Sequence, residues 1–261
     1  MPPSYILFEA DSSGVAVVTI NRPEKRNALS AAVIGALAEA VENIAFDPNI
    51  RGAIITGSGD KAFVAGGDIA ELSALSPSGV REYIERGQRL LRRIETLGKP
   101  TVAAVNGHAL GGGMELAMAC SVRFAADTAR LGMPEVKLGA IPGYGGCERL
   151  PRLVGRGRAL ELMLSGEPIG AAEAHRIGLV NGVVPQGELL AFSRAWLAAA
   201  LSNAPLAMRL AMEAVDVGFD SGLEAGQRFE AAAFSVCAAS EDYREGMRAF
   251  LEKRRAVFAG R

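Results

Sequence analysis

The chain has 261 residues, a length that fits one large domain or two small ones. Hydrophobic residues make up 49% of it and charged residues 22%, which is typical of a soluble globular protein and excludes a disordered or collagen-like chain. The 28 basic and 29 acidic residues sum to a net charge of −1, so no global field favours nucleic acid or an anionic membrane.

Cysteine and histidine usage limits the chemistry that side chains can supply. Cys120, Cys147 and Cys237 are an odd set without CxxC spacing, so we expect reduced thiols in a cytoplasmic protein. The two histidines are far apart and have no carboxylates at ligand spacing, so we expect no zinc site. Residues 1–14 lack a secretion signal, and no stretch approaches ~18 consecutive apolar residues, so we expect neither secretion nor a membrane span.

The predicted elements alternate between strands and helices along the first half of the chain. β-Branched runs closed by turn residues predict buried strands at 15–20, 52–56 and 101–105. Apolar residues at helical spacing predict a helix at 31–45, capped by Ser30, and another at 80–97. This alternation predicts an α/β fold with parallel strands and crossover connections.

Beyond Pro185 the strand signals fade and helix-forming residues dominate, so the last ~75 residues are expected to be all helical. A turn is expected at Tyr243 to Gly246, followed by a final basic amphipathic helix at 247–257. We find no internal repeat and no flexible linker. The expected arrangement is a compact core with a helical appendage that serves subunit packing.

One glycine cluster matches a nucleotide-binding pattern. Gly57, Gly59 and Ala62 fit GxGxxA, which places a pyrophosphate at a helix start in dinucleotide-binding folds. The following stretch, AFVAGGDI, contains more glycine and no long amphipathic helix. A plain turn is therefore the favoured interpretation.

A second cluster, three consecutive glycines at 111–113, stands at the expected start of a helix with Glu115 in its first turn. Free N–H groups and the positive end of the helix dipole together predict an anion or oxyanion site. The alternative is a sharp turn followed by a solvated first-turn acid. This segment alone does not separate the two interpretations.

Glu135 follows Pro134 and lies between apolar residues in a segment rich in glycine and proline. Desolvation there would raise the carboxyl pKa, as a general acid near neutral pH requires. For an isolated glutamate, a surface loop acid is the alternative. Glu115 and Glu135 bracket a short strand, and two such acids returned to one pocket can divide acid and base work between them.

Four segments in combination resemble the enoyl-CoA hydratase, or crotonase, superfamily: FVAGGDI, NGHALGGGMELAMAC, PEVKLGAIPGYGG and FLEKRRAVF. The resemblance extends from Ile20 to Phe258. It implies a crotonase-type spiral of repeated ββα units as the catalytic core over residues 1–200. It also implies a C-terminal helical oligomerisation region over residues 201–261 that builds a homotrimer or a dimer of trimers.

The resemblance further implies a trans-2-enoyl-CoA hydratase, which adds water reversibly across the C2=C3 bond of a short or medium chain enoyl-CoA in fatty acid β-oxidation. Glu115 and Glu135 are the expected catalytic acids, and the N–H groups of Gly67 and Gly112 the expected oxyanion donors. Contacts to CoA are expected from Arg26, Ala28, Ala65, Gly66, Asp68, Ile69 and, from a neighbouring subunit, Lys253. The resemblance implies no metal and no cofactor beyond the CoA of the substrate.

Several alternatives stay open at this point. An enoyl-CoA isomerase can work with one carboxylate, so the presence of both acids favours water addition; a hydratase of a specialised acyl-CoA fits equally. Balanced charge and both acids disfavour a non-catalytic scaffold or a nucleic-acid-binding relative. We expect Glu115 to deprotonate water and Glu135 to protonate C2, with the reverse or a concerted division left open. Tyr144 either borders the acyl pocket or is a turn aromatic.

Overall fold

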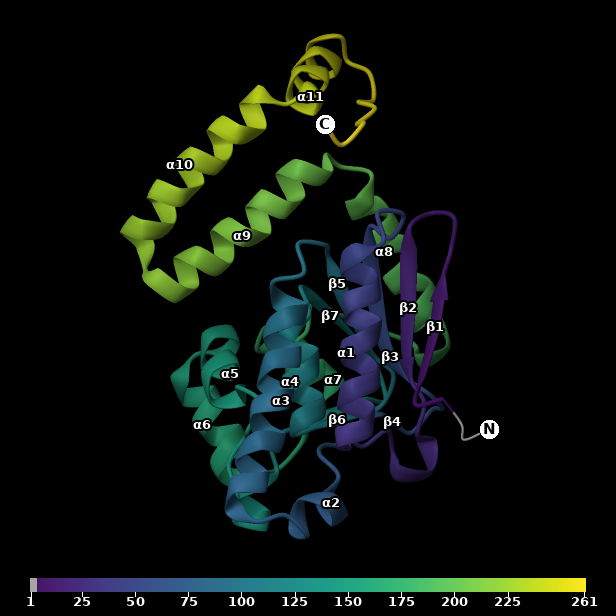
Figure 1. The fold of residues 1–261 in the computed structure, drawn as a ribbon, viewed down its shortest axis with the longest axis vertical. Helices are drawn as coiled ribbons and strands as arrows, with labels where there is room; N and C mark the ends of the chain where they lie inside the picture. The colour runs from purple at the N-terminus through teal and green to yellow at the C-terminus, as the bar shows by residue number, and fades with distance from the viewer. Residues whose placement is uncertain (1–3) are drawn as a thin grey trace.

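Two β-sheets and their covering helices form the core of the computed structural model, which describes residues 4–261 (Figure 1). Residues 1–3, which the predicted core includes, lie outside the described part. In the larger sheet β1 pairs antiparallel with β2, and the other pairings are parallel. Its six strands, in spatial order, are β1 (Ile6–Ala10), β2 (Val15–Ile20), β3 (Gly52–Gly57), β5 (Thr101–Val105), β7 (Val122–Ala126) and β10 (Gly182–Val184).

The smaller sheet is threaded through the same part of the chain. Its four strands, in spatial order, are β4 (Ala62–Val64), β6 (His108–Leu110), β8 (Arg130–Gly132) and β9 (Ile169–Gly170). Three successive segments each add one strand to the larger sheet, one to the smaller sheet and then a helix: β3-β4-α3, β5-β6-α4 and β7-β8-α5. The predicted α/β spiral of repeated ββα units is confirmed.

Eight α-helices of the described chain belong to the core, and side-chain caps mark where the two longest of them begin. The Ser30 hydroxyl accepts the Val33 N–H at 3.2 Å and starts the first helix as predicted. The predicted helix at 80–97 begins earlier, at Pro77, because Ser76 caps it. The helices are α1 (Ala31–Phe46), α2 (Ile69–Ser73), α3 (Pro77–Glu95), α4 (Gly112–Ala119), α5 (Gly146–Val154), α6 (Arg156–Ser165), α7 (Ala171–Arg176) and α8 (Leu189–Leu201).

Helix α4 occupies the centre of the core. All eight of its residues are buried, and it contacts α3, α5 and strands of both sheets. Close packing requires glycine at its second position, since a Cβ at Gly113 would overlap the carbonyl oxygen of Val64 in β4. Surrounding contacts on every side therefore fix the position of α4.

The GxGxxA match is a turn, as the sequence favoured. Gly57 ends β3, and Ala62 begins the short strand β4 rather than a helix. The side-chain amide of Asn106 donates to the carbonyls of Gly57 and Gly59, both at 2.8 Å. These bonds hold the turn between the two sheets, so the nucleotide-binding interpretation is wrong.

Helices make up most of the described chain beyond Pro185, as expected, and no strand follows there, although residues 252–261 are not helical. Helices α9 (Pro205–Ser221), α10 (Leu223–Ala239) and α11 (Glu241–Leu251) lie together at one end of the molecule, beyond the core (Figure 1). Several of their large apolar side chains are more than half exposed: Val215, Phe219, Leu223, Phe234, Val236, Phe250 and Leu251. None of the helices within residues 4–261 has both the length and the apolar character to cross a bilayer.

The prediction of a final helix at 247–257 is wrong. Helix α11 begins at Glu241 because Ser240 caps it, accepting the Tyr243 N–H at 3.0 Å, so the expected turn is the first part of this helix. The chain then leaves the helix after Leu251 and folds back. The buried carboxylate of Asp242 accepts the N–H groups of residues 259 and 260 at 2.6 and 2.9 Å and secures this tail.

The space around two helical glycines, one in α4 and one in α1, predicts opposite effects of substitution by alanine on stability. Gly113→Ala should lower the free energy of unfolding by at least ~3 kcal/mol, because the new Cβ would force α4 away from Val64. Gly35→Ala, at an exposed position in α1 with nothing within 4 Å of the new Cβ, should instead stabilise by about 0.5–1 kcal/mol. Urea unfolding measures both, and equal stabilities for the two variants would contradict the packing.

Candidate active site

The candidate site is built around the N-terminus of α4. Gly111 has a φ of 50°, and its N–H donates to the carbonyl of Gly132 at 2.9 Å, so the chain turns sharply from β6 into the helix. A side chain at this φ would be strained, and its Cβ would overlap the carboxyl group of Glu135. The turn therefore presents the first N–H groups of α4 and the positive end of its dipole close to Glu135.

Gly67 and Gly112 carry the two main-chain N–H groups expected to bind an oxyanion. Gly67 forms a parallel β-bridge with Leu29. The two hydrogen bonds of this bridge are made by the residues on either side of Gly67 and not by Gly67 itself. Leu29 donates its N–H to Gly66 at 2.9 Å, and Asp68 donates to Leu29 at 3.0 Å. The N–H of Gly67 consequently points away from Leu29. In the described part of the chain, neither expected donor is used in a protein hydrogen bond, so both are available to a ligand.

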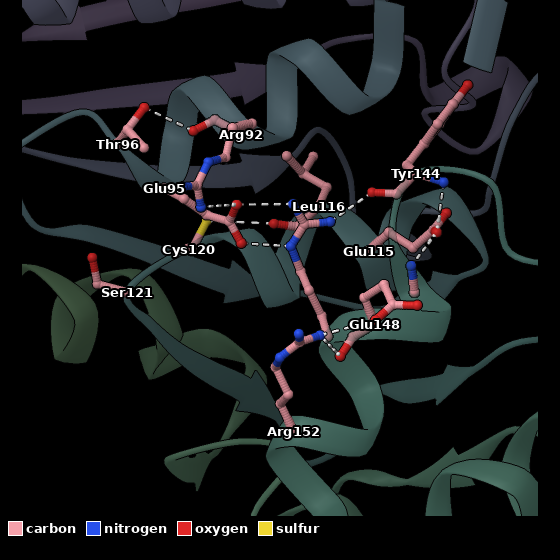
Figure 2. A network of polar contacts seen from close by, with 12 residues as sticks. Arg92, Glu95, Thr96, Glu115, Leu116, Cys120, Ser121, Tyr144, Glu148 and Arg152 are labelled. Atoms are coloured by element: carbon pink, nitrogen blue, oxygen red, sulfur yellow. Dashed lines mark hydrogen bonds and ion pairs between the residues drawn. The ribbon is translucent and has the colours of Figure 1, made fainter. Parts of the chain in front are cut away.

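Glu115 is the single charged residue of α4, and only 1% of it is exposed. Its Oε1 atom accepts the N–H groups of Tyr144 and Gly146, both at 2.7 Å (Figure 2). Burial raises the pKa of Glu115 to about 7, although the two N–H donors oppose this; the charge of Glu135 raises it as well. A carboxyl group with this pKa can both take up and release a proton near neutral pH.

Glu135 reaches the same end of α4 from the 3-10 helix η2 (Glu135–Leu138). Its Oε1 atom lies against Gly111, and its Oε2 atom is buried without a hydrogen-bond partner in the described chain. Burial raises the pKa of this carboxyl group. The structure thus brings Glu115 and Glu135 to one place, and leaves on Glu135 an oxygen that a bound molecule can satisfy.

This arrangement has a definite chemical capacity. Two free N–H groups, one of them at the start of α4, can stabilise negative charge that develops on a carbonyl oxygen. Two carboxyl groups with raised pKa can divide proton removal and proton delivery between them. The site is therefore suited to acid–base chemistry beside a polarised carbonyl group.

Two tyrosines border the expected oxyanion donors, and sequence reasoning identified one of them. The ring of Tyr144 is 3.0 Å from the position that a Cβ would have at Gly112, and it fills space that Gly87 leaves open on α3. Its hydroxyl group is buried, has no partner among the described residues and lies 4.0 Å from the Cβ position of Gly67. Tyr83 of α3 lies beside it with ring centroids 6.3 Å apart. No sequence signal pairs Tyr83 with Tyr144, because the helix and the loop meet only in the fold.

The segments expected to contact CoA in the N-terminal half lie side by side. The N–H of Ala65 donates to the carbonyl of Arg26 at 3.1 Å, and the neighbouring Leu29 bonds to Gly66 and Asp68, so residues 26–29 and 65–69 are joined through the main chain. Arg26 and Ile69 are exposed, Ala28 and Ala65 are half-buried, and Gly66 is buried. These two segments are thus partly exposed on either side of buried residues, and one of them contains the expected oxyanion donor Gly67.

Asp68 differs from the other expected contacts because its carboxylate is already engaged. It pairs with Arg22 at 2.7 Å and accepts the N–H groups of Ala70 and Glu71 at the start of α2. The Arg22 hydrogen bond lowers the pKa of Asp68 and keeps it charged. Its side chain holds the loop, so main-chain atoms are what Asp68 offers to a ligand.

Lys253 is not brought to these residues within one chain. It follows α11 with a φ of 55°, and α11 and α2 lie at opposite ends of the molecule in Figure 1. The expected contact requires a neighbouring subunit and stays a prediction.

Possible metal ligands and cysteine pairs are the remaining features to locate in the described chain. Within residues 4–261 no group of three or more His, Cys, Asp or Glu side chains is placed to hold a metal ion. In the same range the three cysteines are not joined by a disulfide bond.

Comparison with known proteins gives one consistent result. The sequence model of the enoyl-CoA hydratase/isomerase family matches residues 10–261. The chain is 48% identical to a crotonyl-CoA hydratase of Syntrophomonas wolfei, over 97% of both chains, and 44% identical to a short-chain-enoyl-CoA hydratase of Clostridium acetobutylicum, over 92% of both. A crystal structure of an enoyl-CoA hydratase from Bacillus anthracis superimposes with a TM-score of 0.94 at 39% identity, covering 98% of this chain and 100% of that one.

The raised pKa of Glu115 predicts a loss of stability as the pH rises. The folded state holds its proton up to about pH 7, whereas the unfolded chain releases it near its ordinary value of 4.5. The free energy of unfolding of the wild type should therefore fall, relative to Glu115→Gln, by about 2.5 kcal/mol from about pH 5 to about pH 8. Urea unfolding of both proteins across this range measures the difference. A difference that stays constant with pH would contradict a buried, protonated Glu115.

Proposed function

Because the chain belongs to the enoyl-CoA hydratase/isomerase family, we propose that it is a trans-2-enoyl-CoA hydratase. It adds water reversibly across the C2=C3 bond of an enoyl-CoA to give a 3-hydroxyacyl-CoA. The observation that carries this proposal is the meeting of two carboxyl groups with raised pKa at the start of α4. An isomerase needs one such group, so the pair favours hydration.

The N–H groups of Gly67 and Gly112 bind the thioester oxygen in this proposal. Attack of water at C3 moves negative charge onto that oxygen, and donors fixed in advance stabilise the charge without reorganisation. Removal of one such donor typically costs about 3–4 kcal/mol of transition-state stabilisation. The dipole of α4 adds to the second donor, since Gly112 is the first residue of that helix.

The two carboxyl groups transfer the protons. We assign to Glu115 the removal of a proton from water and to Glu135 its delivery to C2. Glu115 is held by two N–H donors on one oxygen, which leaves its other oxygen for the water. The unpartnered Oε2 atom of Glu135 is the oxygen from which a proton can reach the substrate. Main chain and carboxyl groups supply all of this chemistry, so the CoA of the substrate is the only cofactor that the proposal includes.

Aromatic rings border the expected oxyanion donors, which favours a short acyl chain. The Tyr144 ring occupies the volume between Gly112 and Gly87, and Tyr83 lies next to it. Relatives at 48% and 44% identity carry the names crotonyl-CoA hydratase and short-chain-enoyl-CoA hydratase. We therefore assign short enoyl-CoA thioesters as the substrates, bound along segments 26–28 and 65–69, and β-oxidation in the cytoplasm as the setting.

The assembly that we propose is a homotrimer or a dimer of trimers. The exposed apolar side chains of α9, α10 and α11 support it, because a monomer gains nothing by presenting Phe219, Phe234 and Phe250 to water. The same assembly would bring Lys253 of one subunit toward the CoA of the next. Nucleic acid is not a proposed partner, since the net charge is −1.

Crotonyl-CoA hydration tests the assignment of the two acids. Glu115→Gln and Glu135→Gln should each lower kcat about 10²- to 10⁴-fold, because each removes one proton-transfer group. Binding of a saturated acyl-CoA should change little, since neither carboxyl group holds the CoA moiety. Loss of the ultraviolet absorbance of the enoyl thioester measures the first quantity and calorimetry the second. Near-wild-type turnover in either variant would overturn its role.

Acyl length selectivity tests the role of the Tyr144 ring. Tyr144→Ala should raise the ratio of kcat/KM for an eight-carbon over a four-carbon enoyl-CoA by at least about tenfold, because it empties the space beside Gly112. Tyr144→Phe, which keeps the ring, is the matched control and should retain the wild-type ratio. An unchanged ratio in Tyr144→Ala would show that the ring does not limit the chain.

A further inference from the structure

Glu115 is held by a turn that is itself held from outside the site. The N–H groups of Tyr144 and Gly146 converge on one carboxyl oxygen of Glu115. Gly145 between them has a φ of 101°, and a Cβ at Gly146 would lie 2.9 Å from that same oxygen. A turn of this shape leaves little tolerance, since a small shift would misdirect both N–H groups. The carbonyl of Tyr144, in the peptide group between the two donor peptides, accepts a further hydrogen bond.

Arg149 is the group that fixes this carbonyl. Its Nη1 atom donates to the Tyr144 oxygen at 2.6 Å, from the first turn of α5. The guanidinium group and the turn fit closely, because a Cβ at Gly145 would overlap Nη1. Arg149 thus contacts the peptide group between Tyr144 and Gly145, which lies between the two peptide groups whose N–H groups bind Glu115.

Glu95, the last residue of α3, holds Arg149 in turn. The contact is bidentate, with Nε and Nη2 of Arg149 donating to the two carboxyl oxygens at 2.5 and 2.9 Å. The side chains are only 16% and 21% exposed, so this is not a solvated surface pair. Bidentate arginine–carboxylate contacts fix both distance and orientation. A chain of contacts therefore runs from α3 through Glu95 and Arg149 to the turn and on to Glu115.

We propose that Arg149, oriented by Glu95, is a positioning residue for hydration: it keeps the Tyr144–Gly146 turn in the one arrangement that aims both N–H groups at Glu115. The inference rests on the proposed function for its catalytic consequence, although its effect on the Glu115 carboxyl group is independent of turnover. A merely structural ion pair between α3 and α5 is the alternative. It would affect stability and leave the titration of Glu115 unchanged.

Charge supports the same assignment. The titratable and charged groups that act on Glu115, or feel its charge, are Glu135, Arg149, Tyr144 and Cys147. Within the described chain, Arg149 is the one cation among these four groups. Its charge lowers the pKa of Glu115, whereas burial raises it. Loss of Arg149 removes both this charge and the support of the two N–H donors. Both losses raise the pKa of Glu115.

The test compares Arg149→Met with Arg152→Met, the matched control one turn later in α5. Arg152 pairs with Glu148 in the same helix and does not contact the turn. With crotonyl-CoA, Arg149→Met should lower kcat about tenfold or more with a smaller change in KM, because misdirected groups cost rate rather than binding. Arg149→Lys keeps the positive charge but cannot make the bidentate contact with Glu95, so it should recover only part of the lost kcat. Arg152→Met should match the wild type.

A second measurement does not need turnover. The pH dependence of urea unfolding, compared between Arg149→Met and Arg149→Met/Glu115→Gln, reports the Glu115 titration, which should move to higher pH than in the wild-type background. Should Arg149→Met not fold, Glu95→Gln replaces it, with the same shift expected. Wild-type kcat together with an unshifted Glu115 titration would overturn the inference. An inactive wild type whose Glu115 titration still shifts on loss of Arg149 would overturn the proposed function and leave the positioning role standing.

Discussion

The arrangement of the site depends on the burial of one carboxyl group, that of Glu115. Glu115 is 1% exposed in a helix that is otherwise apolar, and removal of its charge from water raises its pKa to about 7. An unpaired charge there would be costly, so the N–H groups of Tyr144 and Gly146 compensate part of the desolvation. Because burial and the N–H donors shift the pKa in opposite directions, Glu115 is close to half protonated at neutral pH, where a proton-transfer residue is most useful.

Glycine makes this balance sterically feasible. Gly113 lets α4 approach β4, Gly111 leaves room for the carboxyl group of Glu135, and Gly146 approaches Glu115 more closely than a residue with a Cβ can. The catalytic proposal and the fold therefore have a common requirement. The close approach that buries α4 is the same one that places main-chain N–H groups where a thioester oxygen can reach them.

Local patterns predicted much of this from sequence. Ser30, β-branched runs and the glycines at 111–113 mark elements through short-range chemistry, so their positions were readable. The pairing of Glu95 with Arg149, and of Tyr83 with Tyr144, joins residues 54 and 61 positions apart, and no periodicity encodes such meetings. The final helix was misplaced because Gly246 suggested a turn, whereas the Ser240 cap begins a helix that contains it.

The most direct test of a buried, protonated Glu115 is its own titration. Infrared difference spectra between the wild type and Glu115→Gln, recorded over a pH series, isolate the carbonyl stretch of this one protonated carboxyl group. The structure predicts that the band disappears with a midpoint at about pH 7. A midpoint near the ordinary glutamate value of 4.5 would show a solvated carboxylate and contradict the account.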